Sequence, residues 1–220
     1  GAVRGSTKRI QISFDEWNVW YIDRFHGVDK IEGIDNWPIA PRLLEDVYSV
    51  ADAVVFGNLM ISLLKHADRV TSASLAQLVN VIAPIMTEPQ GPAWRQTTFY
   101  PFSITSRLAQ GEALELKLDA PTYTTSAYGE VPLVDAVATH DAESGRSAAF
   151  LVNRSRTEAI TVTVDVASLG DVSILETHTL ADDDVYAKNT LAEPERVSVH
   201  PNDTARIESG TLTVTLPPVS

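Results

Sequence analysis

Only two segments in the first half of the chain are typical of β-strands, and a helical segment follows each of them. Residues 8–14 alternate apolar and polar side chains, and residues 70–85 return to a strand-like composition. Residues 43–66 carry apolar side chains at helical spacing, and residues 97–109 predict a second helix. This order predicts a parallel α/β unit. Parallel strands need neighbours on both sides, so we expect a segment N-terminal to Gly1 to complete the sheet.

The second half of the chain contains further segments with strand-like alternation of side chains and, unlike the first half, no helical spacing between them. Residues 112–118, 159–166 and 211–216 alternate apolar and polar side chains, as strands do when one face is buried. Turn-forming sequences at 143–146 and 208–210 separate such strands. The pattern predicts an antiparallel β-sandwich.

Charge and composition change at the same place. Residues 1–110 contain ten basic and eleven acidic side chains, whereas residues 111–220 contain seven and eighteen. The net charge of −12 therefore lies almost entirely in the second half. This shift places a boundary between two structural units near Gly111. The acidic balance also argues against nucleic acid and an anionic membrane surface as partners.

Composition excludes several kinds of chemistry. The chain has no Cys, which rules out disulfides, thiolate metal sites and a Cys nucleophile. No apolar run approaches the ~20 residues of a membrane-spanning helix, and no basic-then-apolar leader is present. His140, His178 and His200 lack metal-ligand spacing, and the acidic run 182–184 lacks the pattern of a calcium loop. We expect no metal, no membrane partner and a cytoplasmic location.

Residues 15–20, with the sequence Asp-Glu-Trp-Asn-Val-Trp, directly follow the first predicted strand. In α/β barrels the catalytic groups lie at the C-terminal ends of strands. A carboxylate there can attack the anomeric carbon of a sugar, and Trp rings offer flat apolar faces to sugar C–H groups. An acidic loop beside two core Trp residues fits the same spacing. Asp23 and His26, in a long loop predicted over 21–42, are further candidates for the mouth of a pocket.

The segment ISFDEWNVWY, residues 12–21, resembles the nucleophile strand of the α-L-arabinofuranosidases of glycoside hydrolase family 51. Residues 43–70, residues 74–102 and the region around 188–190 resemble the same family in the same order. The resemblance implies a (β/α)8 barrel, a TIM barrel, followed by an antiparallel, jelly-roll-like β-sandwich.

The same resemblance divides the chain and assigns roles to three residues. Residues 1–110 would hold the last two barrel strands with their helices, and residues 111–220 the sandwich. Glu16 takes the position of the nucleophile, Trp20 that of an aromatic residue of the substrate pocket, and Gln77 that of a residue that hydrogen-bonds the arabinose ring. The acid/base Glu of the family follows an earlier strand and has no counterpart here. Because a retaining glycosidase needs two carboxyl groups about 5–5.5 Å apart, we expect this chain to be inactive by itself.

The resemblance thus implies the C-terminal portion of a retaining, exo-acting α-L-arabinofuranosidase that needs no cofactor. It would hydrolyse terminal non-reducing arabinofuranosyl residues of arabinan- or arabinoxylan-type oligosaccharides. The expected partners are that oligosaccharide, the N-terminal remainder of the barrel, and further copies in a homo-oligomer of the complete enzyme. Two alternatives stay open: a non-catalytic carbohydrate-binding or structural sandwich, and another glycosidase specificity, such as xylosidase or endoglucanase, on the same scaffold.

Overall fold

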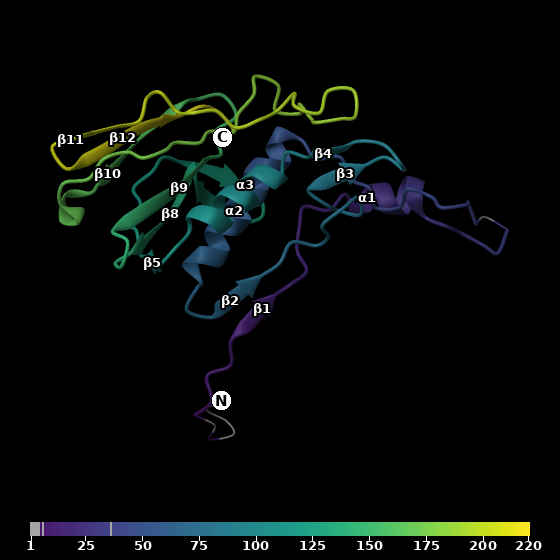
Figure 1. The fold of residues 1–220 in the computed structure, drawn as a ribbon, viewed down its shortest axis with the longest axis horizontal. Helices are drawn as coiled ribbons and strands as arrows, with labels where there is room; N and C mark the ends of the chain where they lie inside the picture. The colour runs from purple at the N-terminus through teal and green to yellow at the C-terminus, as the bar shows by residue number, and fades with distance from the viewer. Residues whose placement is uncertain (1–4, 6, 36) are drawn as a thin grey trace.

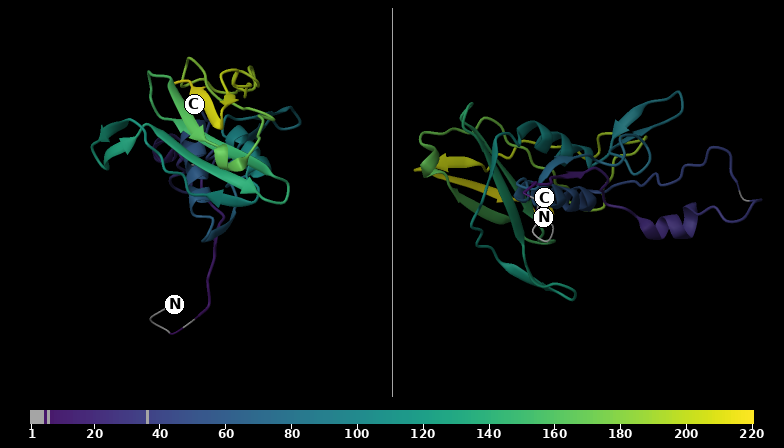
Figure 2. Two further views of the ribbon diagram at one scale, coloured as in Figure 1. Left: turned by 90° about the vertical axis from the view of Figure 1, so that its left-hand side faces the viewer. Right: turned by 90° about the horizontal axis from the view of Figure 1, so that it is seen from below.

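The computed structural model describes residue 5, residues 7–35 and residues 37–220. A long central helix lies between a set of antiparallel sheets and a short pair of parallel strands (Figure 1). The segment that carries α1 (Ile22–Arg24) projects from the end of the molecule opposite the sheets, as the right-hand view of Figure 2 shows.

The two strands predicted in the first half do pair in parallel. β1 (Ile12–Phe14) and β2 (Val70–Ala73) form a two-stranded sheet with Ile12 opposite Val70 and Phe14 opposite Ala73. The apolar side chains that alternate along β1 are not buried: Ile12 is 40% and Phe14 43% exposed. Among the described residues, no further strand pairs with these two.

The region 70–85 is not one strand, and the region 21–42 is not entirely loop. β2 ends at Ala73, and an irregular segment leads to the hairpin of β3 (Ile85–Thr87) and β4 (Ala93–Arg95). In the other region, α1 continues into a π-helical turn, Phe25–Asp29.

The central helix is α2 (Val50–Lys65), and it begins later than the predicted residue 43. Ser49 caps it: the Ser49 backbone N–H donates to Asp52 Oδ2 at 2.7 Å, and the Asp52 N–H donates to Ser49 Oγ at 3.4 Å. This reciprocal arrangement satisfies two backbone donors that the first turn leaves free. A helix that began at residue 43 would place Glu45 and Asp46 in its first turn, but both residues precede the helix.

Apolar side chains of α2 enter three separate clusters. Val54 and Ile61 pack with sheet residues, Phe56 and Met60 pack with Trp17, and Val50 packs with Ala187 and Val197. The helical spacing also predicts that Val55 and Leu59 are buried, which is wrong. They are exposed, because no segment among the described residues covers that side of the helix.

The second predicted helix is confirmed as α3 (Phe99–Leu108). Pro101 lies in its first turn, where an intrahelical N–H is not required. The chain then turns through Gly111, whose φ is +76°. A Cβ at this position would come within 2.1 Å of the His140 carbonyl oxygen, so only Gly fits the turn.

The second half forms two three-stranded antiparallel sheets, which confirms the predicted sandwich. One sheet has the order β5-β8-β9 and the other β10-β12-β11, while β6 and β7 form a separate hairpin. The predicted turns at 143–146 and 208–210 connect β8 to β9 and β11 to β12. The bounds are β5 (Glu112–Leu114), β6 (Thr122–Thr125), β7 (Gly129–Pro132), β8 (Val134–Asp141), β9 (Arg146–Asn153), β10 (Ile160–Asp165), β11 (Arg206–Glu208) and β12 (Thr211–Leu216), with a 3₁₀ turn at Ala167–Leu169.

A segment of the second half returns to the start of α2. The Val50 N–H donates to the Ala187 carbonyl at 3.1 Å, and the Ala51 N–H donates to the Val185 carbonyl at 2.9 Å. Asn189, which is fully buried, donates to the Arg95 carbonyl at 3.0 Å. Backbone donors at the helix start are thus satisfied by the segment that connects β10 to β11.

Candidate active site

Two of the candidate residues follow the ends of the two parallel strands. Glu16 lies two residues after the end of β1, and Gln77 lies four residues after the end of β2. Because carboxyl ends of parallel strands meet at one edge of a sheet, both residues lie at the same edge. Both side chains are exposed to solvent.

The residue after Glu16 anchors this segment in the core. The Trp17 ring is buried and stacks on Phe56, with centroids 4.7 Å apart and planes inclined by 21°. The ring centroid of Phe102, in α3, lies 6.5 Å from that of Trp17. A buried Trp17 is unavailable to a sugar, so of the two Trp residues in the motif only Trp20, which is 46% exposed, can contact one.

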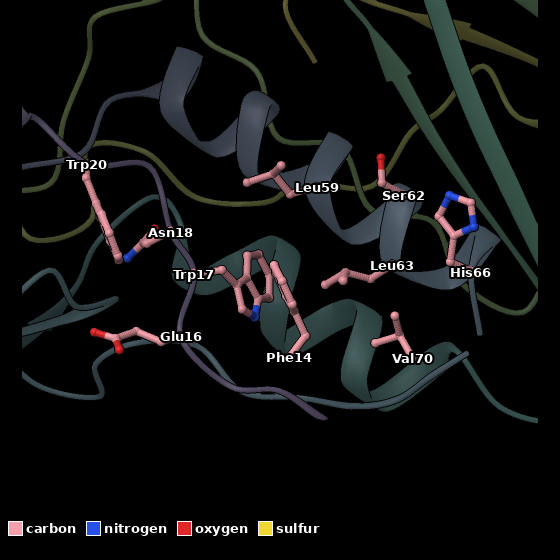
Figure 3. A pocket seen from close by; sticks show the side chains of 10 residues that line it. All are labelled: Phe14, Glu16, Trp17, Asn18, Trp20, Leu59, Ser62, Leu63, His66 and Val70. Atoms are coloured by element: carbon pink, nitrogen blue, oxygen red, sulfur yellow. The ribbon is translucent and has the colours of Figure 1, made fainter. Parts of the chain in front are cut away.

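Glu16 and Trp20 line one end of an open groove of about 390 Å³ between β1 and α2 (Figure 3). The interior of the groove is apolar, with Phe14, Trp17 and Leu63 along it. The Glu16 side chain points away from Trp17, to the other side of the backbone (Figure 3). The carboxylate therefore faces away from the apolar packing between strand and helix.

Gln77 lines a different hollow, together with Leu78, Phe99 and Ser103. The described residues thus place Glu16 and Trp20 together, with Gln77 nearby at the same sheet edge but in a separate depression. A short hydrogen-bonded link joins the two segments: Asn18 Nδ2 donates to the Ala76 carbonyl at 3.1 Å. The amino-acid pattern singled out neither Asn18 nor this link.

Tyr21, which follows Trp20, donates hydrogen bonds to two buried carboxylates. The Tyr21 N–H donates to Asp46 Oδ2 at 3.0 Å, and its hydroxyl donates to Asp52 Oδ2 at 2.5 Å. Burial raises the pKa of Tyr21, and the hydrogen bond and charge of Asp52 raise that pKa further. The Ser-x-x-Asp spacing of the helix cap at Ser49 was the available signal for Asp52, but nothing in the sequence connected it to Tyr21.

Asp23 and His26 do not join this arrangement. Asp23 lies in α1 and His26 in the turn after it, and both are exposed. Neither lines the groove of Glu16 or the hollow of Gln77. The structure therefore gives these two residues no place in the candidate site.

The acidic run of the second half forms an ordinary turn. Asp182 Oδ1 accepts a hydrogen bond from Arg196 at 2.9 Å and another from the Asp184 N–H at 2.9 Å. The Arg196 guanidinium holds the pKa of Asp182 below its ordinary value. No group of three or more potential metal ligands occurs within the described part of the chain. No described helix has the length and apolar character needed to cross a membrane.

Comparisons with known proteins agree on one family. Residues 15–220 match the family model described as the alpha-L-arabinofuranosidase C-terminal domain. An exo-alpha-(1->6)-L-arabinofuranosidase of Bifidobacterium longum is 59% identical over 214 residues, 96% of this chain and 41% of its own length. An intracellular exo-alpha-(1->5)-L-arabinofuranosidase of Streptomyces lividans is 55% identical over 220 residues, all of this chain and 33% of its own length.

The fold shows the same relationship. A solved family 51 alpha-L-arabinofuranosidase from Bifidobacterium longum matches 99% of this chain and 42% of its own, with a TM-score of 0.88 and 48% identity. The chain thus spans less than half the length of the relatives that it matches. On these grounds the chain belongs to the α-L-arabinofuranosidases of glycoside hydrolase family 51.

Proposed function

We propose that this chain supplies the nucleophile of a retaining, exo-acting α-L-arabinofuranosidase. The observation that carries the proposal is the position of Glu16 at the carboxyl edge of the β1–β2 pair, with its side chain turned away from the apolar groove. Trp17 fixes the backbone beside it. The activities in the names of the relatives support the substrate class, a terminal arabinofuranosyl residue.

The reaction needs two carboxyl groups, of which Glu16 is one. The Glu16 carboxylate attacks the anomeric carbon, the glycosidic bond breaks, and an arabinosyl-enzyme ester forms. An acid/base Glu from an earlier strand of the complete enzyme gives its proton to the leaving oxygen. It then takes a proton from the water that hydrolyses the ester. Trp20 offers an aromatic face to the sugar, and Gln77 donates to or accepts from a ring hydroxyl.

The remaining architecture follows from this proposal. Residues 1–110 would be the last two strand–helix units of a (β/α)8 barrel, and residues 111–220 its jelly-roll-like sandwich. The N-terminal remainder of the barrel would cover Ile12, Phe14 and the exposed side of α2, which are open in the described chain. Homo-oligomeric assembly and a cytoplasmic location complete the proposal, and the word intracellular in the name of a relative supports the second.

Replacement of Glu16 in the complete enzyme tests the proposal. Glu16→Ala should lower kcat on 4-nitrophenyl α-L-arabinofuranoside by about 10³-fold or more, because no covalent ester can form. Azide should restore part of the rate and give a glycosyl azide of inverted configuration, since azide attacks from the side that Glu16 occupied. Glu115→Ala, at an exposed position beyond α3, is the matched control and should retain activity.

Two outcomes would count against the proposal. Full activity in Glu16→Ala would remove the nucleophile assignment. A panel of nitrophenyl glycosides on which a xyloside or glucoside reacts faster than the arabinofuranoside would remove the substrate class.

A further inference from the structure

Asn18, between Glu16 and Trp20, makes three hydrogen bonds at the edge where the candidate residues lie. Its Nδ2 donates to the Ala76 carbonyl at 3.1 Å and to the Ile82 carbonyl at 2.5 Å. Its Oδ1 accepts from the Val19 N–H at 2.8 Å. The side chain is half-buried, so solvent only partly replaces these contacts if they are lost.

These contacts reach the backbone that carries Gln77. Ala76 directly precedes Gln77, and the Gln77 N–H donates to the same Ile82 carbonyl at 3.2 Å. Within the described residues, the two bonds from Asn18 are the only side-chain hydrogen bonds between residues 15–20 and residues 74–85. Beyond the backbone pairing of β1 with β2 and the Ser74 N–H bond to the Phe14 carbonyl, Asn18 therefore supplies the polar side-chain link that ties the Gln77 segment to the Glu16 segment.

The chemistry of the contacts is specific for an amide side chain. Two carbonyl oxygens need a donor with two N–H bonds, and the Val19 N–H needs an acceptor on the same group. An Asp at this position, once ionised, would place a carboxylate against two carbonyl oxygens with no hydrogen to offer. A Ser could donate only one hydrogen bond.

We propose that Asn18 is a positioning residue that holds sugar-binding Gln77 at a fixed place relative to nucleophilic Glu16. This inference rests on the proposed function of those two residues. Asn18 does not touch the sugar, and it acts through the backbone of residues 76–82. Loss of the link leaves Glu16 on its Trp17 anchor but releases Gln77, which weakens transition-state binding.

A double-mutant cycle in the complete enzyme tests this inference. Asn18→Asp should lower kcat/KM for 4-nitrophenyl α-L-arabinofuranoside by about 10-fold or more, because small displacements of binding groups are costly. In a Gln77→Ala background the same change should cost about 3-fold or less, since the group that Asn18 positions is already absent. Asn18→Ser should show a smaller loss of kcat/KM with the same dependence on Gln77. This variant replaces Asn18→Asp in the cycle if the Asp variant does not fold.

The matched control changes another half-buried Asn far from the strand ends. Asn58→Asp removes the hydrogen bond from Asn58 Nδ2 to Asp135 Oδ2 and places two carboxylates together. It should lower the melting temperature yet keep kcat/KM within about 2-fold. Equal, independent losses from Asn18→Asp with and without Gln77 would show that Asn18 only supports the fold, and would overturn the inference.

Hydrogen exchange on the chain itself separates this inference from the proposed function. In Asn18→Asp, the amides of residues 76–82 should exchange faster while those of α2 stay unchanged. Unchanged exchange at 76–82 would overturn the inference even if Glu16 proves to be the nucleophile. Conversely, an active Glu16→Ala enzyme would defeat the proposed function, and the exchange result would still decide whether Asn18 holds this segment.

Discussion

The strand pair β1–β2 and the sheet β5-β8-β9 reach different degrees of burial. In β8, Val134, Ala136 and Val137 are buried against neighbours on both sides. In β1, the alternating residues Ile12 and Phe14 remain exposed. Alternation therefore states which side chains can share a face, whereas burial depends on whether another segment covers that face.

The central helix α2 is attached to the sandwich by both apolar and polar contacts. Val54 and Ile61 of the helix share a cluster with Val137, Val152 and Val219. Asp135 of β8 accepts hydrogen bonds from Asn58 and Arg154, each at 2.9 Å, and pairs with Lys65. The helix is thus fastened to the sandwich, although the charge boundary at Gly111 assigns it to the other unit.

Hydrogen exchange of the 220-residue chain should show the largest contrast between the regions. Amides of β8, β9 and α2 should exchange at least about 100-fold more slowly than those of β1 and β2, because only the former lie in packed clusters. A boundary at Gly111 that separated α2 from the sandwich would leave the helix in the incomplete first unit and predict fast exchange there too, so α2 distinguishes the two views. Fast exchange in α2 would show that the helix is not held by the sandwich.

Paired truncations of Ile side chains should sharpen the same contrast. Ile61→Ala removes a buried side chain of α2 and should lower the free energy of unfolding by about 2–4 kcal/mol. Ile12→Ala, at a partly exposed position of β1, should cost less than about 1 kcal/mol in this chain. Urea denaturation followed by circular dichroism measures both, and equal losses would contradict the difference in packing.

Gln77→Ala should affect function rather than fold. In the complete enzyme we expect a loss of roughly 1–3 kcal/mol in transition-state binding, seen as a higher KM and a lower kcat. The melting temperature should change little, because the Gln77 side chain is exposed. If the variant equalled the wild type on an arabinofuranoside, Gln77 would have no role in binding the sugar.

The smallest effect is expected at an exposed ion pair that links α3 to the second half. Arg107 donates two hydrogen bonds to Glu176, at 2.8 and 2.9 Å, and with His178 lowers the pKa of Glu176 from 4.5 to about 2. A lowered carboxyl pKa contributes stability above pH 4.5 that is lost as the pH falls towards 2. Glu176→Gln should slightly weaken the dependence of the melting temperature on pH between these values. It should change the melting temperature little at pH 7. A larger drop in melting temperature at pH 7 would contradict a solvent-screened pair.

Local patterns predicted the secondary structure that depends on near neighbours. The helix at 97–109 and both hairpin turns of the sandwich are present. The parallel pairing of the first two strands joins distant residues, and it was predicted from the order of strands and helices instead. The start of α2 was missed because apolar spacing continues upstream of Ser49. The helix begins only after Ser49, because Ser49 caps it and Leu44, with a φ of +57°, is not helical.

The candidate site was predictable only as far as one contiguous motif reached. The position of Glu16 after a strand follows from residues 12–16 alone. Trp17 and Trp20 look equivalent in sequence, yet one stacks on Phe56 and the other is exposed, because their neighbours come from α2. The link from Asn18 to Ala76 spans 58 residues, so no local pattern could indicate it.

Covalent trapping tests the central claim, that Glu16 is the nucleophile, most directly. The complete enzyme would be treated with a 2-deoxy-2-fluoro-α-L-arabinofuranoside that has a good leaving group, and its peptides would be analysed by mass spectrometry. The fluorine slows hydrolysis of the covalent intermediate, so the sugar should remain attached to the peptide of residues 10–24, on Glu16. A label on another carboxylate, or inactivation that persists undiminished in Glu16→Ala, would contradict the account.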